Sequence, residues 1–283
     1  MSASFVCGRF ELSLERPLVM GIVNVTPDSF SDGGQHDTRD SAIDHARLLI
    51  SQGADMLDIG GESTRPGAPR VETADEAARI LPVIEALRDT GIPLSVDTYK
   101  PDVMRAALDA GADMLNDICG FASDAALQVA AADKRCGLCV MHMLGEPQTM
   151  QASEPHYDDV VAEVSRFLLA RAQRLQAAGV DSRRITLDPG LGFGKSVAHN
   201  YTLLARLRAM GSHGYPLLVG LSRKSMIGAI TGKPVDQRLA GSLAGMLAAA
   251  ARGAAILRVH DVAQTVDALA VWRATESFEE KQV

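Results

Sequence analysis

Residues 94–118 read LSVDTYKPDVMRAALDAGADMLNDI and contain one complete unit of the fold. Two short apolar runs, residues 94–97 and 114–118, have the composition of buried β-strands, and the amphipathic stretch between them has helical spacing. Gly111 follows that stretch, where the left-handed residue that ends a helix is most easily a glycine. The segment therefore predicts a strand, a crossover helix and a second strand parallel to the first.

This strand–helix unit recurs along the chain. Eight apolar runs are candidate strands, at residues 19–25, 56–60, 94–97, 114–118, 138–142, 185–188, 217–220 and 256–259. Amphipathic or Ala- and Leu-rich stretches that suit crossover helices lie at residues 40–51, 74–88, 102–108, 157–178 and 237–251. Near-continuous apolar strands indicate a parallel sheet that is covered on both faces. Eight repeats favour an α/β fold closed into a (β/α)8 TIM barrel over a doubly wound open sheet, which is the alternative.

The length of the chain favours one domain. A chain of 283 residues with 47% hydrophobic content can bury a large core, and barrels of this length usually form a single domain. Residues 5–14 alternate around Gly8 and predict a short β-hairpin ahead of the barrel. We therefore expect an N-terminal hairpin in residues 1–16, a barrel in residues 17–275 and a charged tail in residues 276–283.

Composition narrows the partners and the compartment. The formal charge of −7 argues against a polyanion-binding surface, so nucleic acid is not an expected partner. The first residues lack the basic and apolar regions of a signal peptide, and the four cysteines do not suggest a disulfide framework, so we expect a cytoplasmic protein. Residues 239–257 invite a transmembrane interpretation, but Arg252 and Gly253 interrupt them; a helix and then a buried strand are expected, with no membrane partner.

Polar side chains collect where the candidate strands end. They are Asn24, Asp58, Glu62, Asp97, Asn116, His142, Asp188, Ser222, Ser225, Arg258 and His260. In a (β/α)8 barrel, the C-terminal ends of the strands surround one active-site mouth, so residues scattered along the chain converge there. We expect an active site at this end, although a structural ion-pair network is the alternative for any one residue.

Several of these side chains suit a flat, nitrogen-rich ring. Asp97, Asn116 and Asp188 offer two carboxylates and an amide to a heterocycle that carries N–H donors, such as an aminopyrimidinone. Lys224 supplies a donor for a ring carbonyl or nitrogen. Arg258 can lie flat on an aromatic face while it reaches towards phosphate oxygens.

A second group suits a pyrophosphate with magnesium. Arg258 and His260 are two residues apart at a strand end, so both can face the same anion. A lone histidine is often structural, and that alternative stays open for His260. Asn24 is a candidate Mg²⁺ ligand, because Mg²⁺ takes few protein ligands and keeps waters while it bridges phosphate oxygens.

Two polar connections follow the first two strands. Residues 24–34 read NVTPDSFSDGG and have the composition of a lid, and residues 61–67 read GESTRPG and combine hydroxyls with a guanidinium suited to an anion. An ordinary turn is the alternative for each. Residues 190–196, GLGFGKS, imitate a phosphate-binding loop but have Pro189 where that motif needs glycine. The lone CxxC pair, Cys136 with Cys139, is interpreted as structural.

Eight motifs, in order and at strand ends, resemble those of the dihydropteroate synthases. They lie at residues 24–34, 61–67, 95–98, 116–118, 141–143, 187–195, 222–225 and 258–261. The resemblance extends from residue 19 to residue 262 and departs from the family at no motif position. It implies an enzyme that joins a pterin pyrophosphate to para-aminobenzoate on the route to folate.

The resemblance also implies roles for individual residues. The implied pterin site consists of Asp97, Asn116, Asp188, Lys224 and Arg258. The implied pyrophosphate site consists of Asn24, Thr64, Arg258 and His260, with Mg²⁺ on Asn24. The implied para-aminobenzoate site consists of Phe30, Thr64, Arg65, Pro66, Phe193, Lys224 and Ser225. The implied catalytic residues are Asp97, Asn24, Arg258, His260 and Asp32.

Members of this family are usually homodimers that associate through helices in the C-terminal part of the barrel. The resemblance therefore implies a homodimer here, and Gly241 and Gly245 would permit close helix contact. Two other functions remain as alternatives. A pterin-dependent methyltransferase would have no use for a pyrophosphate pocket, and a non-catalytic pterin-binding paralogue would have lost one of the reactive loops.

Overall fold

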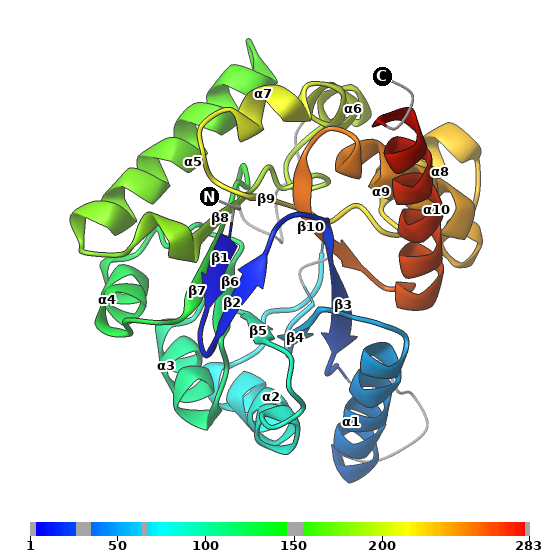
Figure 1. The fold of residues 1–283 in the computed structure, drawn as a ribbon. Helices are drawn as coiled ribbons and strands as arrows, with labels where there is room; N and C mark the ends of the chain where they lie inside the picture. The colour runs from blue at the N-terminus through cyan, green and yellow to red at the C-terminus, as the bar shows by residue number, and fades with distance from the viewer. Residues whose placement is uncertain (1–3, 27–34, 64–66, 146–154, 281–283) are drawn as a thin grey trace.

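A computed structural model describes residues 4–26, 35–63, 67–145 and 155–280. Eight parallel strands close into a barrel in the order β10-β3-β4-β5-β6-β7-β8-β9 (Figure 1). They are β3 (Leu18–Asn24), β4 (Met56–Gly60), β5 (Leu94–Asp97), β6 (Met114–Asp117), β7 (Gly137–Met141), β8 (Ile185–Asp188), β9 (Leu217–Val219) and β10 (Ala254–Val259). The predicted TIM barrel is confirmed, and the doubly wound alternative is excluded because β10 pairs with β3.

Helices surround the strands. They are α1 (Gln35–Ser51), α2 (Thr73–Leu87), α3 (Pro101–Ala110), α4 (Asp124–Ala132), α5 (Val160–Ala177), α6 (Val197–Ala205), α7 (Leu207–Gly211), α8 (Ser225–Thr231), α9 (Leu239–Ala250) and α10 (Val262–Glu280), with short 3-10 turns at Ser182–Arg184 and Val235–Gln237. Gly111 has φ +115° and ends α3 as predicted. Asp159 caps α5 with its carboxylate, so that helix begins at Val160 and not at residue 157.

The apolar stretch at residues 239–257 is not one long helix. It divides into α9 and β10, with the turn at Gly253 between them. No helix in the part of the chain that the structure describes is long and apolar enough to cross a membrane.

Inside the barrel, an apolar layer lies below a polar one. The apolar layer consists of Phe5, Cys7, Leu18, Met20, Met56, Met114, Cys139, Leu218 and Ile256. Successive strand residues point to opposite faces, so Asp58 follows Met56 on the inner face and Asn116 follows Met114. The intervening residues, such as Leu115, pack outward against the helices in the larger core. The apolar layer is therefore the floor on which the polar residues stand.

The predicted N-terminal hairpin closes the other end of the barrel. β1 (Ser4–Cys7) pairs with β2 (Phe10–Ser13) antiparallel, and Phe5 and Cys7 contribute to the apolar layer. Gly8 turns the hairpin with φ +62°, and a Cβ there would overlap the side chain of Asp113. The hairpin thus approaches the barrel where a larger residue could not.

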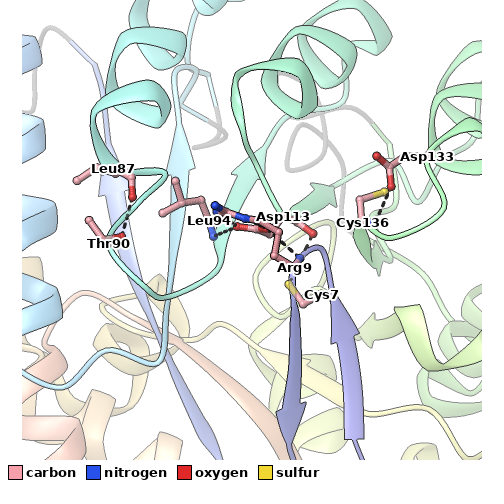
Figure 2. A network of polar contacts seen from close by, with 8 residues as sticks. All are labelled: Cys7, Arg9, Leu87, Thr90, Leu94, Asp113, Asp133 and Cys136. Atoms are coloured by element: carbon pink, nitrogen blue, oxygen red, sulfur yellow. Dashed lines mark hydrogen bonds and ion pairs between the residues drawn. The ribbon is translucent and has the colours of Figure 1, made fainter.

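Asp113 fastens the hairpin to the barrel (Figure 2). Its carboxylate accepts hydrogen bonds from Arg9 Nε at 2.9 Å and Arg9 Nη2 at 3.0 Å. It also accepts from the backbone N–H groups of Arg9 and Leu94, each at 3.2 Å. The carboxylate is buried, whereas Arg9 is 41% exposed, so most of the energy comes from the satisfied buried donors and little from the ion pair.

We predict that Asp113→Ala lowers the free energy of unfolding by about 2 kcal/mol, because it leaves a buried N–H group without an acceptor. Urea unfolding followed by circular dichroism measures the change. Asp44→Ala is the control, since Asp44 forms an exposed ion pair with Arg47 at 3.7 Å and its loss should cost under about 0.5 kcal/mol. Equal losses for the two variants would contradict the proposed anchoring.

Candidate active site

The polar layer brings together side chains from five strands. Asp58 lies on β4, Asp97 on β5 and Asn116 on β6, and the register pairs Asp97 directly with Asn116. Asp188 ends β8, and Arg258 lies near the end of β10. Because parallel strands present their C-terminal ends at one mouth of the barrel, residues up to 200 positions apart become neighbours.

Arg258 is the centre of this layer. Its Nε donates to Asp58 Oδ2 at 2.5 Å, and its Nη2 donates to Asp97 Oδ2 at 2.8 Å. Asn116 Nδ2 donates to the same Asp58 oxygen at 3.1 Å. One guanidinium therefore holds two carboxylates in place, the buried one of Asp58 and the largely buried one of Asp97, and Asp58 in turn fixes the amide of Asn116.

Burial sets the protonation of these groups. It raises the pKa of Asp97 to about 7; the charge of Arg258 opposes that rise, and the negative charge of Asp58 adds to it. Burial also raises the pKa of Asp188, although Lys224 and the Gly190 N–H group act in the opposite direction. Asp97 can therefore change its charge close to neutral pH.

Asn116 presents an acceptor to the pocket. Its Oδ1 atom is buried and, among the described residues, has no hydrogen-bond partner, and the same is true of Asp58 Oδ1. Buried polar atoms are nearly always hydrogen-bonded, so a ligand with N–H donors would satisfy an acceptor in this position. Such a ligand matches the nitrogen-rich ring expected from the sequence.

Lys224 closes the pocket from the side of β9. It precedes α8, and its ammonium donates to the carbonyl oxygen of Leu191 and lies 4.5 Å from the centroid of the Phe193 ring. Burial lowers the pKa of Lys224 to about 8, while the negative charge of Asp188 raises it. Lys224 thus lies between the carboxylate of Asp188 and the aromatic ring of Phe193, which is on the loop after β8.

His260 and Asn24 lie on the neighbouring strand ends. β10 pairs with β3, so the segment with Arg258 and His260 runs beside the strand that ends at Asn24. His260 Nδ1 lies 3.1 Å from the hydroxyl oxygen of Ser222. The loop that carries Ser222 is held to the start of α10 by an ion pair between Arg223 and Asp261 at 2.5 Å.

Asn24 is the residue that the sequence assigns to a metal ion. The described residues contain no group of three or more His, Cys, Asp or Glu side chains that could hold an ion. A metal bound through Asn24 could take its other ligands from water and substrate. Mg²⁺ binds in this way, because it retains waters and is shared with phosphate oxygens.

Comparison with known proteins accounts for this arrangement. A family model described as a pterin binding enzyme matches residues 20–260. The chain is 49% identical over 272 residues to the dihydropteroate synthase of Escherichia coli (strain K12), and the match covers 96% of each protein. This chain belongs to the dihydropteroate synthase family.

Solved structures of dihydropteroate synthases have the same fold at high similarity. The Xanthomonas albilineans dihydropteroate synthase with 4-aminobenzoic acid has a TM-score of 0.92 and 53% identity, over 98% of this chain and 99% of that one. The Burkholderia cenocepacia enzyme complexed with 7,8-dihydropteroate has a TM-score of 0.91 and 56% identity, over 99% of each chain.

The structure gathers most of the residues that the resemblance to dihydropteroate synthases implies. Asp97, Asn116, Asp188, Lys224 and Arg258 lie close together at the C-terminal end of the barrel, Asn24 and His260 lie on adjoining strand ends, and Phe193 and Ser225 adjoin Lys224. Five expected residues lie outside the described part of the chain and are not placed: Phe30, Asp32, Thr64, Arg65 and Pro66.

Asp58 is a strand-end residue to which the motifs give no role, yet it is fully buried and contacts both Arg258 and Asn116. An acidic residue on the inner face of an otherwise apolar strand is the signal that could have identified it. Cys136 and Cys139 are buried free thiols, and burial raises the pKa of Cys136 to about 12. This fits the structural interpretation, because a reactive cysteine needs an accessible thiolate.

Proposed function

We propose that this protein condenses 6-hydroxymethyl-7,8-dihydropterin pyrophosphate with para-aminobenzoate, giving 7,8-dihydropteroate and pyrophosphate for folate biosynthesis. The observation that carries the proposal is the convergence of Asp97, Asn116, Asp188, Lys224 and Arg258 at the barrel mouth in a chain about half identical to dihydropteroate synthases. The reaction transfers a pterin-methyl group, so the protein is a transferase. We further propose that it acts in the cytoplasm as a single domain.

The pocket suits each part of the pterin substrate. The carboxylates of Asp97 and Asp188 and the Asn116 Oδ1 atom accept from the ring N–H groups, and Lys224 donates to a ring carbonyl or nitrogen. Arg258 lies against the ring and extends towards the pyrophosphate, where His260 and Asn24 approach from the adjoining strand ends. Para-aminobenzoate binds beside Phe193, Lys224 and Ser225.

The chemistry favours early departure of the leaving group, since the aromatic amine is a weak nucleophile. The bond between the pterin methylene carbon and oxygen breaks, and pyrophosphate takes the electron pair. Arg258 and His260 stabilise the departing anion, and the Asp97 carboxylate stabilises the positive charge on the pterin. The amine lone pair then forms the carbon–nitrogen bond, and the amine releases a proton to solvent. Mg²⁺, held by Asn24, water and substrate oxygens, would supply further positive charge to the leaving group.

The assay for this function follows both products. Purified protein is mixed with the pterin pyrophosphate, para-aminobenzoate and Mg²⁺, and pyrophosphate and dihydropteroate are measured together. We expect equal amounts of the two products and loss of both when EDTA removes the metal. Binding of the pterin without turnover would favour the non-catalytic paralogue. Methyl transfer from a methylated pterin, without pyrophosphate chemistry, would favour the methyltransferase.

The role of the Asp97 carboxylate can be tested by mutation. We expect Asp97→Asn to reduce kcat by about a hundredfold, because it removes a charge aimed at the developing pterin cation. In the wild type, kcat/KM for the pterin substrate should fall as the pH drops through about 7, where Asp97 gains its proton, and the variant should lack that component. Asp102→Asn on the exposed face of α3 is the control. A variant with wild-type kcat and pterin affinity would remove Asp97 from the mechanism.

We also propose that the protein is a homodimer and that α8 and α9 form its interface. An apolar groove there is lined by side chains that include Leu221, Ile227 and Ile230, and Ile230 is 67% exposed. The two glycines of α9 line this groove and also allow close packing within the chain. A Cβ at Gly241 would overlap Ile227, and one at Gly245 would overlap Leu221, so both glycines serve packing within the chain.

A charge in the groove tests the dimer. We expect Ile230→Glu to convert the protein to a monomer in sedimentation velocity, because burying the new carboxylate at an apolar interface is unfavourable. Leu48→Glu is the matched control, since Leu48 on α1 is a side chain of the same size that is also exposed, at 51%. A wild-type monomer at micromolar concentration, or a dimer that survives Ile230→Glu, would contradict this interface.

A further inference from the structure

The loop between β8 and α6 contains a buried lysine that the proposed mechanism does not use. Lys195 Nζ lies 2.9 Å from three acceptors: Gly190 O, Phe193 O and His142 Nδ1. It also lies 3.3 Å from His142 O. The ammonium therefore points back into its own loop, and the segment that imitates a phosphate-binding motif encloses a cation of the protein itself.

The glycines of this loop let the carbonyl groups surround the ammonium. Gly190 has φ +66°, and a Cβ there would overlap the carbonyl oxygen of His142. Gly194 has φ +59°, and a Cβ there would overlap Leu144. The loop consequently packs directly on the residues that follow β7, and the Lys195 ammonium lies against the carbonyl groups of Gly190 and Phe193.

His142 completes the enclosure as a neutral ring. Burial and, to a smaller extent, the positive charge of Lys195 together lower the pKa of His142 to about 3. A neutral ring can accept at Nδ1, so the ammonium has a good acceptor there. The ring packs edge-on against Phe167 with centroids 4.9 Å apart, and the His142 backbone N–H donates to Asp188 O at 3.1 Å. The enclosure is thus fixed to two strands of the barrel.

The same loop forms one wall of the proposed para-aminobenzoate site. Phe193 supplies a carbonyl to Lys195 and a ring to Lys224, whose ammonium lies 4.5 Å from the ring centroid. Leu191 O accepts from Lys224, and a Cβ at Gly192 would lie 3.0 Å from Lys224 Cδ. The residues fixed by Lys195 are therefore the residues that position the Phe193 ring and the Lys224 side chain.

We propose that Lys195 is a positioning residue for the aromatic-amine half of the active site: its enclosed ammonium holds the β8–α6 loop in the shape that places Phe193 and Lys224. This inference rests on the proposed function. Lys195 touches no substrate and acts through these two residues. Asp188 and Lys224 also contact the pterin under the proposed function, but Asp97, Asn116 and Arg258 hold it from other strands, so loss of Lys195 should affect the amine more than the pterin.

The charge of Lys195 is sensitive to pH. Burial lowers the pKa of Lys195 to about 7; the carboxylate of Asp188 raises it, and the ammonium of Lys224 lowers it. His142, the other titratable group that faces it, stays neutral in this range. Below about pH 7 the ammonium has three N–H donors for the surrounding acceptors, and above it the amine has two. The loop should therefore be held less firmly as the pH rises from 6 to 8.

Lys195→Met tests the inference, because methionine keeps the length and removes the charge and the donors. We expect the KM for para-aminobenzoate to rise about tenfold or more, the effect of losing hydrogen bonds to a charged group, while the KM for the pterin substrate rises by a clearly smaller factor because Asp97, Asn116 and Arg258 still hold the ring. Lys134→Met is the matched control, since Lys134 is exposed and bonds only Ala131 O among the described residues. Equal rises in both KM values, or none, would overturn the proposal.

Two further measurements separate positioning from general damage. In the wild type, the KM for para-aminobenzoate should rise between pH 6 and pH 8, and Lys195→Met should lack this component. In a double-mutant cycle with Phe193→Ala, the two effects on that KM should be less than additive, because Lys195 acts through Phe193. If Lys195→Met does not fold, Lys195→Gln, which keeps N–H donors without the charge, is measured in the same way. A wild type that forms no dihydropteroate would reject the proposed function; an active wild type with additive effects would reject only the role of Lys195.

Discussion

The shared hydrogen bonds of Arg258 with Asp58 and Asp97 are the interaction on which the rest of the pocket depends. Both carboxylates stand on a floor of methionine, leucine and isoleucine side chains, where an unpaired charge would be strongly unfavourable. Loss of either acid would leave the guanidinium half paired, and loss of the guanidinium would leave two like charges adjacent. Asn116 takes its orientation from Asp58, so the pterin-facing acceptors share one support.

The N-terminal end of the barrel contributes to stability, whereas the C-terminal end carries the candidate active site. At the N-terminal end, Asp113 binds Arg9 and Leu94 and closes the barrel with the hairpin, where no ligand is needed. At the C-terminal end, burial raises the pKa of Asp97, and the buried Oδ1 atoms of Asp58 and Asn116 have no hydrogen-bond partner among the described residues. Both features are unfavourable for folding. The apolar floor between them makes both possible, because it supplies core packing and lowers the dielectric beneath the site.

The sequence predicts the barrel well because each strand–helix unit can be recognised from its own apolar strand, amphipathic helix and helix-ending glycine. Asp97, Asn116 and Asp188 lie at or near the ends of short apolar strands, so the sequence alone predicts that they lie at the mouth of the barrel. Asp58 could not be assigned in the same way, since its partner Arg258 is 200 positions away and the pairing exists only once the barrel has closed. Lys195 was recognisable only as a failed phosphate-binding motif, because its partners are mostly backbone carbonyls, which have no residue signature. Gly241 and Gly245 indicate close approach, but the sequence alone does not say that Ile227 and Leu221 of the same chain are among the residues that approach them.

Charge balance explains why the leaving group needs help from outside the pterin pocket. Asp58, Asp97 and Asp188 face Arg258, Lys224 and Lys195, so the acids and bases of this layer offset one another. Asp97, Lys224 and Lys195 have pKa values of about 7, about 8 and about 7, so these three groups are only just held in their charged forms. A pyrophosphate entering such a layer meets little surplus positive charge. Under the proposed function, the adjoining ends of β3 and β10, where Asn24 and His260 lie, would contribute compensating charge, and a divalent cation shared with the substrate is a form of charge that a single asparagine could help to hold.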